Sequence, residues 1–292
     1  MDLTAGTATM GDSILSNQTA IRLVSFFLIL VAMAVWEAIA PRRERQLTRL
    51  ARWPHNIGIV LINTLLLRVL FPTAAVGMAF YAQARGWGLL NGSTTSNWIL
   101  VPLCVAVLDL AIYLQHVMFH AVPLLWRFHR MHHVDLDFDV TTGARFHPVE
   151  IVLSMIIKFA VIIALGPPAI AVFLFEVILN ATAMFNHSNV RIPSTIDRIL
   201  RCLVVTPDMH RVHHSIEEDE TNSNFGFNLP WWDRLFGTYR AQPRAGHEGM
   251  IIGIRGFREP RVCDQLPGML MIPFAENVNS YAINRNRGGD RD

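Results

Sequence analysis

Residues 98–120 read WILVPLCVAVLDLAIYLQHVMFH, an apolar run that leads directly into a pair of histidines. The segment Trp98–Leu114 is about long enough to cross a bilayer as a helix. His116 and His120 follow at a spacing of four, which places both rings on one face of a helix. The stretch therefore predicts a membrane helix that carries imidazole groups to its end.

The composition supports a membrane protein. Of 292 residues, 52% are hydrophobic and only 16% are charged, whereas an average soluble domain has about 25% charged residues. The mean hydropathy is +0.32. These values exclude a freely soluble globule and a disordered chain, and the net charge of +2 excludes a nucleic-acid-binding protein. The three cysteines are too far apart for a disulfide framework or a CxxC metal motif.

Apolar stretches recur along the first two thirds of the chain. Pro72 and Arg68 interrupt the second stretch, so we expect a kinked or broken span there. Gly166, Pro167 and Pro168 separate the last two stretches, which predicts a helical hairpin. The stretches are Leu23–Ala40, Ile57–Ala84, Trp98–Leu114, Val149–Leu165 and Ala169–Phe185.

Basic residues indicate the orientation. Five arginines between Arg42 and Arg52 fall in one short loop, and short basic loops mark the cytoplasmic side. We therefore expect the N-terminus outside and the segments His120–Phe146 and 187–292 in the cytoplasm. Residues 1–20 are polar and lack the basic cluster of a cleaved signal peptide. Residues 284–292, NRNRGGDRD, are expected to form a frayed tail.

Ten of the twelve histidines lie between residues 116 and 214, and eight of them form three motifs at helical spacing. HVMFH contains His116 and His120, HRMHH contains His129, His132 and His133, and HRVHH contains His210, His213 and His214; the other two are His147 and His187. Core, surface or pH-sensing histidines would not repeat one spacing in three clusters. Eight imidazoles exceed the ligand number of one ion, so the count predicts two metal ions. Imidazole suits iron, zinc, copper and nickel. Catalytic zinc uses fewer protein ligands, so the count favours iron, although spacing alone leaves the metal open.

Acidic residues accompany the motifs. Asp109 shares a helical stripe with His116 and His120, and an ionisable residue within a span is a functional candidate. We expect Asp109 to accept a hydrogen bond from a ligand imidazole and so to fix its orientation; the alternative is a hydrogen bond between packed helices. Asp135, Asp137 and Asp139 alternate after the second motif and are expected to be solvated.

Together these segments resemble the fatty acid hydroxylase/sterol desaturase superfamily of integral-membrane, non-haem di-iron oxygenases. The resemblance runs from Asp109 to Tyr239 and implies an all-α fold, with a membrane anchor of about four spans and a cytoplasmic helical cap that holds two metal ions. It rests on the segments DLAIYLQHVMFH, LWRFHRMHH, TTGARFHPVE, FNHSNV, TPDMHRVHHS and WWDRLFGTY.

The resemblance also implies the ligands and the chemistry. The eight histidines of the three motifs match the family's ligand positions, and His147 and His187 lie where relatives often have further histidines. Members use O2 to hydroxylate or desaturate a lipid, with two iron ions and electrons from a separate donor. Cytochrome b5-, ferredoxin- and pterin-type donors all remain open. Val117 stands where many relatives have arginine, and the segment around His187 lacks a second histidine that some members have there.

The predicted organisation has four parts. They are a polar segment (1–20), anchor helices (21–108), a fatty acid hydroxylase-type catalytic region (109–240) and a C-terminal cytoplasmic segment with the tail (241–292). The expected location is a bacterial-type inner membrane, or the endoplasmic reticulum in a eukaryote. The alternative function is a histidine-rich membrane metal carrier, which typically places its ligands in flexible loops or at mid-span. The sequence does not identify the lipid or the residues that bind it.

Overall fold

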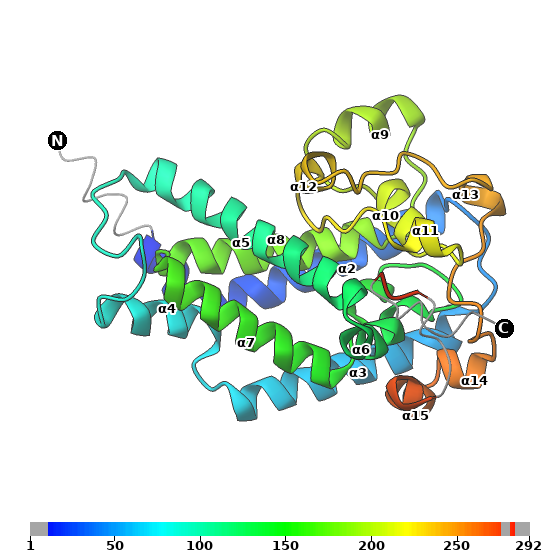
Figure 1. Cartoon of the computed structure of the whole chain (residues 1–292), viewed down its shortest axis with the longest axis horizontal. Helices are drawn as coiled ribbons and strands as arrows, with labels where there is room; N and C mark the ends of the chain where they lie inside the picture. Colours follow the sequence, from blue (N-terminus) through cyan, green and yellow to red (C-terminus); the bar gives the residue numbers. More distant parts are fainter. Residues whose placement is uncertain (1–10, 276–280, 284–292) are drawn as a thin grey trace, which may run out of the picture.

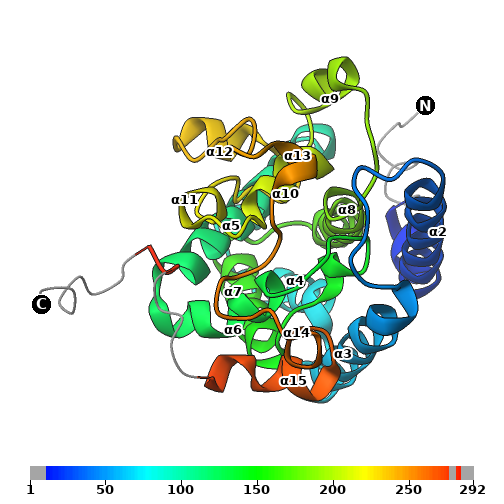
Figure 2. The same cartoon turned by 90° about the vertical axis from the view of Figure 1, so that its right-hand side faces the viewer.

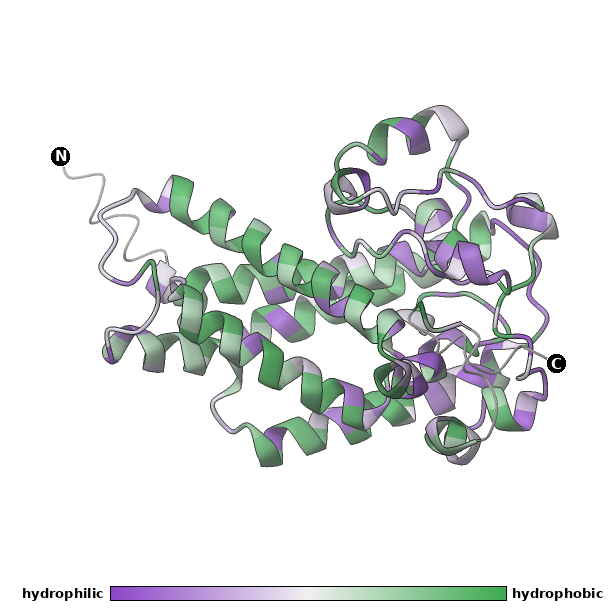
Figure 3. Cartoon of the chain, in the orientation of Figure 1, coloured by the Kyte–Doolittle hydropathy of each residue, from purple (hydrophilic) through white to green (hydrophobic). Residues whose placement is uncertain are grey.

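A computed structural model describes residues 11–275 and 281–283, and all regular structure within them is helical. The first half of the predicted polar segment and the predicted frayed tail lie outside the described residues. Long helices form one end of the molecule, and short helices and loops form a cap at the other end (Figure 1). The long helices are mostly hydrophobic, whereas the cap is mixed (Figure 3). The all-α fold with a membrane anchor is confirmed.

Among the residues that the structure describes, five segments are long and apolar enough to cross a membrane. Each contains one of the predicted apolar stretches, and they number one more than the four or so that the family implies. They are α2 (Gln18–Ile39), α3 with α4 (Arg49–Ala84), α5 (Asn97–Ala121), α7 (Pro148–Leu165) and α8 (Ala169–Asn186).

The predicted breaks lie where the prolines are. The second segment divides into α3 (Arg49–Leu70) and α4 (Ala74–Ala84), because Pro72 lacks the amide hydrogen that a continuous helix needs. Gly166 ends α7 with φ of +66°, a conformation that glycine adopts without strain. Pro168 then precedes the first residue of α8, so the chain turns back as the predicted hairpin.

Two buried glutamates within the spans are paired. Glu176 of α8 accepts hydrogen bonds from Lys158 of α7 (2.8 Å) and Arg22 of α2 (2.7 Å). Glu37, near the end of α2, accepts from the backbone N–H groups of Val140 (2.7 Å) and Asn189 (2.9 Å). Since an unpaired charge is costly in a bilayer, these contacts explain how the spans tolerate ionisable residues. The Glu37 contacts also tie α2 to the cap.

The cap is built on the ends of the long helices. Helix α6 (Pro123–His133) follows α5 after a single residue, Val122, and η1 (Thr142–Ala144) precedes α7. The remaining short helices come after α8 and cover the same end of the bundle (Figure 2). They are α9 (Ser194–Leu200), α10 (Pro207–His213), α11 (Glu218–Thr221), α12 (Trp231–Leu235), α13 (Gly246–Gly249), α14 (Pro260–Cys263), α15 (Leu266–Met271) and η2 (Ile272–Phe274).

The three aspartates after the second histidine motif are buried, so the prediction that they are solvated was wrong. The Arg52 guanidinium pairs with Asp135 (2.6 Å) and with Asp139. Asp137 accepts from the backbone N–H groups of Leu47 (2.8 Å) and Gln46 (3.2 Å). Because the partners come from a segment some 85 residues earlier, local alternation could not reveal them. These contacts clamp the loop after α6 to the start of α3.

Replacing Arg52 tests this clamp. In Arg52→Met, the buried carboxylates of Asp135 and Asp139 lose the charged partner that they share, so we expect a loss of about 3–5 kcal/mol in the free energy of unfolding. Equilibrium unfolding in mixed micelles measures it. The control Arg45→Met removes an exposed arginine and should change stability by less than about 0.5 kcal/mol. Equal stability of the two variants would contradict the role of the clamp.

Candidate metal centre

Four elements carry the histidines to one place. Helix α5 presents His116 and His120 one turn apart, and α6 carries the second motif, with Pro123 in its first turn. His187 is the residue that ends α8. Helix α10 carries the last motif and begins at Thr206, whose side chain accepts a hydrogen bond from the Met209 N–H (3.3 Å).

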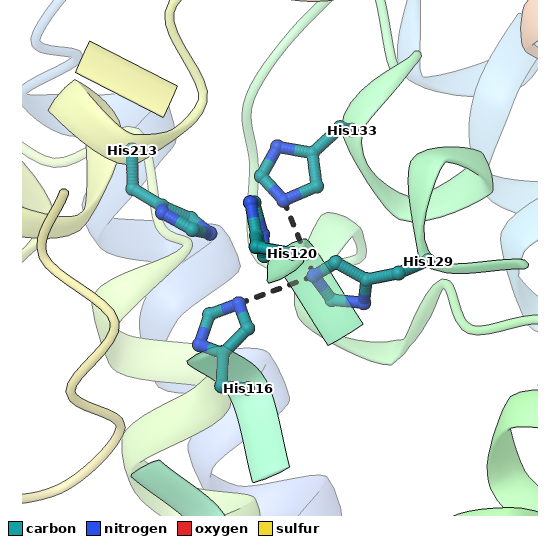
Figure 4. Close-up of side chains that lie close together, drawn as sticks. All are labelled: His116, His120, His129, His133 and His213. Atoms are coloured by element: carbon teal, nitrogen blue, oxygen red, sulfur yellow. Dashed lines mark hydrogen bonds between the residues drawn. The ribbon is translucent and has the colours of Figure 1, made fainter. Parts of the chain in front are cut away.

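Five imidazoles form the first group, in which one ring nitrogen of each residue lies within 4.8 Å of those of the others. Figure 4 shows the five rings around a common space. The Nε2 atom of His129 lies 3.1 Å from that of His116 and 3.2 Å from that of His133. The first group consists of His116, His120, His129, His133 and His213.

Four further imidazoles form the second group by the same criterion. The Nε2 atom of His187 lies 3.1 Å from that of His132 and 3.0 Å from that of His210. The groups adjoin, because the ring of His133 stacks on that of His214 with centroids 4.6 Å apart. The second group consists of His132, His187, His210 and His214, and all nine histidines of the two groups are buried.

Hydrogen bonds at the rear of several rings fix which nitrogen faces the centre. The Nδ1–H groups of His116, His213 and His187 donate to the backbone carbonyl oxygens of Phe225 (2.8 Å), Ser223 (2.7 Å) and Ala183 (2.7 Å), respectively. Since a carbonyl only accepts, Nδ1 carries the proton and Nε2 presents a lone pair. Nδ1 of His129 lies 2.7 Å from the Glu150 carboxylate.

The ring nitrogens that face the centre of each histidine group are suited to binding a cation. Burial lowers the pKa of His213 to about 3 and of His187 to about 4, and holds the pKa values of His132, His133, His210 and His214 well below the ordinary value. The rings are therefore neutral near neutral pH. Nε2 of His120, His213 and His214 is buried without a hydrogen-bond partner. Buried polar atoms are normally satisfied, so this set of neutral nitrogen donors fits a metal ion in each group.

Comparison with known proteins agrees with this chemistry. The fatty acid hydroxylase family matches residues 101–238. This region belongs to that family. The resemblance found in the sequence is thereby confirmed, and together with the apolar helices it makes the chain an integral membrane protein.

Relatives within the superfamily differ in reaction. The chain is 33% identical over 187 residues to ornithine lipid hydroxylase OlsE of Rhizobium tropici, covering 63% of this chain and 53% of that protein. It is 28% identical over 181 residues to human alkylglycerol monooxygenase, covering 61% of this chain and 39% of that protein. It is 27% identical over 173 residues to Delta(7)-sterol 5(6)-desaturase erg3B of Aspergillus fumigatus, covering 56% of this chain and 48% of that protein. The chain thus spans about half or less of these relatives' lengths, and no solved structure matches it.

His147 was also predicted to be a metal ligand, but it belongs to neither of the two histidine groups. It precedes α7, and its Nδ1 accepts a hydrogen bond from the Val149 N–H (3.2 Å). This bond satisfies a backbone donor at the helix start. The structure therefore gives His147 a capping role, which its place before Pro148 in the sequence could have suggested.

Asp109 is also placed differently from its prediction. Its carboxylate accepts from the N–H groups of Asn228 (3.3 Å) and Leu229 (3.1 Å) and from the Trp232 indole (2.9 Å). No imidazole is among these partners, so the expected contact with a ligand ring was wrong. Asp109 instead anchors a cap loop to the middle of α5, which is close to the alternative of a packing hydrogen bond.

Glu150 fills the role that was expected of Asp109. It lies in the first turn of α7, is buried, and accepts from His129 at 2.7 Å. The sequence carried a signal for it, namely a carboxylate three residues after His147 at the start of an apolar helix. That signal does not identify which histidine the carboxylate meets.

A cavity of about 420 Å³ adjoins the first group. Helices α3, α5, α7 and α8 line it with apolar side chains that include Val60, Ile112, Met155 and Leu179. His116, His129 and Glu150 belong to the same wall. Because the lining runs along α7 from Glu150 to Lys158, the cavity extends about 12 Å into the bundle. Its size and apolar lining are typical of a ligand site.

Removing the Glu150 carboxylate should weaken metal binding. In Glu150→Ala, His129 loses the acceptor that orients its ring and raises its basicity, and such losses cost about 10–100-fold in metal affinity. Competition with a chelator measures the affinity. Glu248→Ala removes an exposed carboxylate and should leave the affinity unchanged; an equal loss in both variants would refute the role of Glu150.

Acid should destabilise the metal-free protein. Below pH 6.5 the unfolded chain protonates its histidines. The folded chain does not protonate the buried histidines whose pKa is lowered, which are His132, His133, His210, His213 and His214. Protons therefore favour unfolding, by up to about 1.4 kcal/mol per pH unit for each such histidine. The stability should be present above pH 6.5 and fall towards about pH 4. Thermal unfolding of the protein after a chelator has removed its metal checks this expectation. A midpoint temperature that stays the same from about pH 7.5 to pH 5 would contradict it.

Proposed function

We propose that this protein is a membrane-bound di-iron oxidoreductase that uses O2 to hydroxylate or desaturate a lipid. The observation that carries the proposal is the position of the first histidine group beside an apolar cavity between the membrane helices. The names of the relatives, which include a lipid hydroxylase, a monooxygenase and a sterol desaturase, support the same reaction class.

The chain's histidines would bind one iron ion in each group, five residues in the first and four in the second. Bound iron and O2 supply the oxidising power to break an unactivated C–H bond, which side-chain acid–base chemistry cannot provide. Neutral imidazoles leave the charge of the metal ions largely uncompensated. Backbone acceptors behind His116, His187 and His213 keep those rings oriented before and after turnover.

Side chains of the cavity would hold the substrate. Phe119, Phe146 and Phe227 lie in its wall with the aliphatic residues and would exclude water from the reacting carbon. The Oε2 atom of Glu150 is buried without a partner, while its Oε1 contacts His129. We propose that this free oxygen accepts a further hydrogen bond at the wall of the cavity, which Glu150 lines.

A separate protein or cofactor would supply the electrons, with cytochrome b5-, ferredoxin- and pterin-type donors as the candidates. In support, the three cysteines of the chain are free and far apart in sequence, so they build no iron–sulfur cluster. The cap would face the cytoplasm, because the arginine-rich loop between α2 and α3 lies at that end. The membrane would be a bacterial-type inner membrane, or the endoplasmic reticulum in a eukaryote.

The metal-carrier alternative is not favoured. A carrier must release its cargo, which suits ligands in mobile loops. Here all nine histidines of the two groups are buried, and several rings are held by backbone acceptors. A rigid, enclosed ligand set beside a lipid-sized cavity favours catalysis.

Lipid analysis under ¹⁸O2 tests the function. Lipids from cells that express the protein should contain a species that has gained one labelled oxygen or lost two hydrogens. Cells that express His213→Ala should lack it. A lipid profile identical to that of the His213→Ala cells, in the presence of the cell's own electron donors, would contradict the proposal.

Metal analysis tests the ligand assignment. The purified protein should contain two equivalents of iron, and His214→Asn should lose about one because it removes a ligand of the second group only. His147→Asn is the matched control and should retain both, since it removes a capping group. An iron loss in His147→Asn equal to that in His214→Asn would overturn the assignment.

Filling the cavity should block the substrate and spare the metal. Ile112, in the middle of the α5 wall, is half-buried, and Ile112→Trp would occupy space that the lipid needs. We expect product formation to fall at least about tenfold, with iron content unchanged, since one lost decade of rate corresponds to about 1.4 kcal/mol. Ile112→Leu conserves the volume and should retain most activity. Equal rates in both variants would exclude this cavity as the substrate site.

A further inference from the structure

Large apolar side chains cluster on one exposed side of the cap. Ile199 of α9 and Leu203, just after it, are 63% and 62% exposed. Leu235 of α12 and Phe236, which follows it, are 69% and 52% exposed. Exposed apolar side chains that are grouped mark an interaction surface, whereas scattered ones do not. We call this set the α9–α12 patch; it consists of Ile196, Ile199, Leu203, Trp231, Leu235 and Phe236.

The two parts of the patch are fixed to each other. The Trp231 indole N–H donates to the carbonyl oxygen of Cys202, just after α9, at 2.7 Å. The Arg234 guanidinium donates to the carbonyl oxygen of Arg201 at 3.0 Å. Side chains of α12 thus hold the end of α9, and the apolar residues of both helices form one surface.

The patch is attached to a membrane-spanning helix. The Trp232 indole donates to Asp109 of α5 (2.9 Å), and the ring of Phe236 stacks on Tyr113 with centroids 5.4 Å apart. The Tyr113 hydroxyl lies 2.9 Å from that of Thr238.

These attachments set the depth of α12. Asp109 lies 12 residues before the last residue of α5, which is about 18 Å along the helix axis. Both Asp109 and Tyr113 therefore belong to the part of α5 that is long and apolar enough to span. Leu114, the next residue, is 51% exposed and would face lipid. An element that is attached to α5 at this level lies at the depth of the bilayer and not in the water above it.

Charges border the patch in the pattern that suits a lipid surface. Arg198 lies on α9 and Arg234 on α12, and both are exposed. Arginine can keep its head at lipid phosphates while its stem covers apolar surface. Tryptophan, here the half-exposed Trp231, is enriched at the same level of membranes.

We infer that the α9–α12 patch is a membrane-inserted surface, in which the patch residues enter the acyl boundary of the leaflet beside α5. The partner is the lipid bilayer itself, because the patch continues the lipid-facing side of a spanning helix and has a basic border. The cap is therefore partly embedded, and the metal centre lies close to the level at which lipid chains begin.

A spin label on the native chain tests this inference. Cys202 is the exposed free cysteine, whereas Cys104 and Cys263 are buried, so a thiol-reactive nitroxide reports from within the patch without any substitution. The full chain is placed in phospholipid vesicles. Collision with O2, which concentrates in lipid, is compared with collision with a water-soluble nickel chelate.

We expect the label at Cys202 to collide several-fold more with O2, relative to the chelate, than a label at a site in water. The control is Cys202→Ser with Arg261→Cys, because Arg261 is exposed on α14, which lies at the cap end of the molecule (Figure 1). Equal accessibility ratios at the two sites would overturn the inference. Protection of Cys202 from both reagents would also overturn it, since a second copy or another protein would then cover the patch.

Discussion

Nine buried imidazole rings meet in two adjoining groups, and this arrangement is unfavourable unless a cation is present. Each ring has been desolvated, and the nitrogens at the centre are lone-pair donors that face one another at 3.0–3.2 Å in four of the pairs. Protonation would relieve one contact but create buried charge among eight other rings. A metal ion in each group would satisfy these lone pairs at once. The affinity for a cation is thus built into the way the fold brings the rings together.

Contacts elsewhere in the chain hold the histidine rings together although their burial is unfavourable. Helix α5 is continuous from the lipid-facing segment to His120, so the bundle that fixes α5 also fixes two rings of the first group. The buried pairing of Arg52 with Asp135 and Asp139 holds the loop that follows His133. Glu37 binds backbone groups on both sides of the site, at Val140 and Asn189. Glu37 of α2 and Arg52 of α3, which are charged residues of membrane segments, therefore connect the anchor helices to the cap.

The sequence predicted the parts of this design that are local. Apolar length defined the spans, prolines defined the breaks, and helical spacing grouped the histidines into motifs. The structure also divides the motifs in a way that spacing does not reveal: His132 and His133 are neighbours in sequence but enter different groups, as do His213 and His214. Adjacent residues on a helix point about 100° apart, so one helix end can serve both groups.

What the sequence could not provide was the pairing between distant segments. Asp109 shares a helical stripe with His116, yet its partners come from residues 228–232, and Glu150 reaches His129 from another helix. Both carboxylates are the same chemical group in similar apolar surroundings. Only the tertiary fold decides which of them meets an imidazole and which meets backbone N–H groups. The same argument applies to Asp135 and Asp139, whose partner Arg52 lies far away in sequence.

One loop links the membrane surface to the orientation of the metal ligands. Asp233 of α12 accepts from the N–H groups of Phe225 (2.8 Å) and Gly226 (2.9 Å), and the Phe225 carbonyl oxygen accepts from His116. The Asp109 carboxylate holds the other end of the same loop. A displacement of α12 relative to α5 would therefore move the acceptor behind a ligand ring. With α12 inserted in the leaflet as inferred above, its membrane contact and the orientation of the His116 ring would be mechanically coupled through this loop.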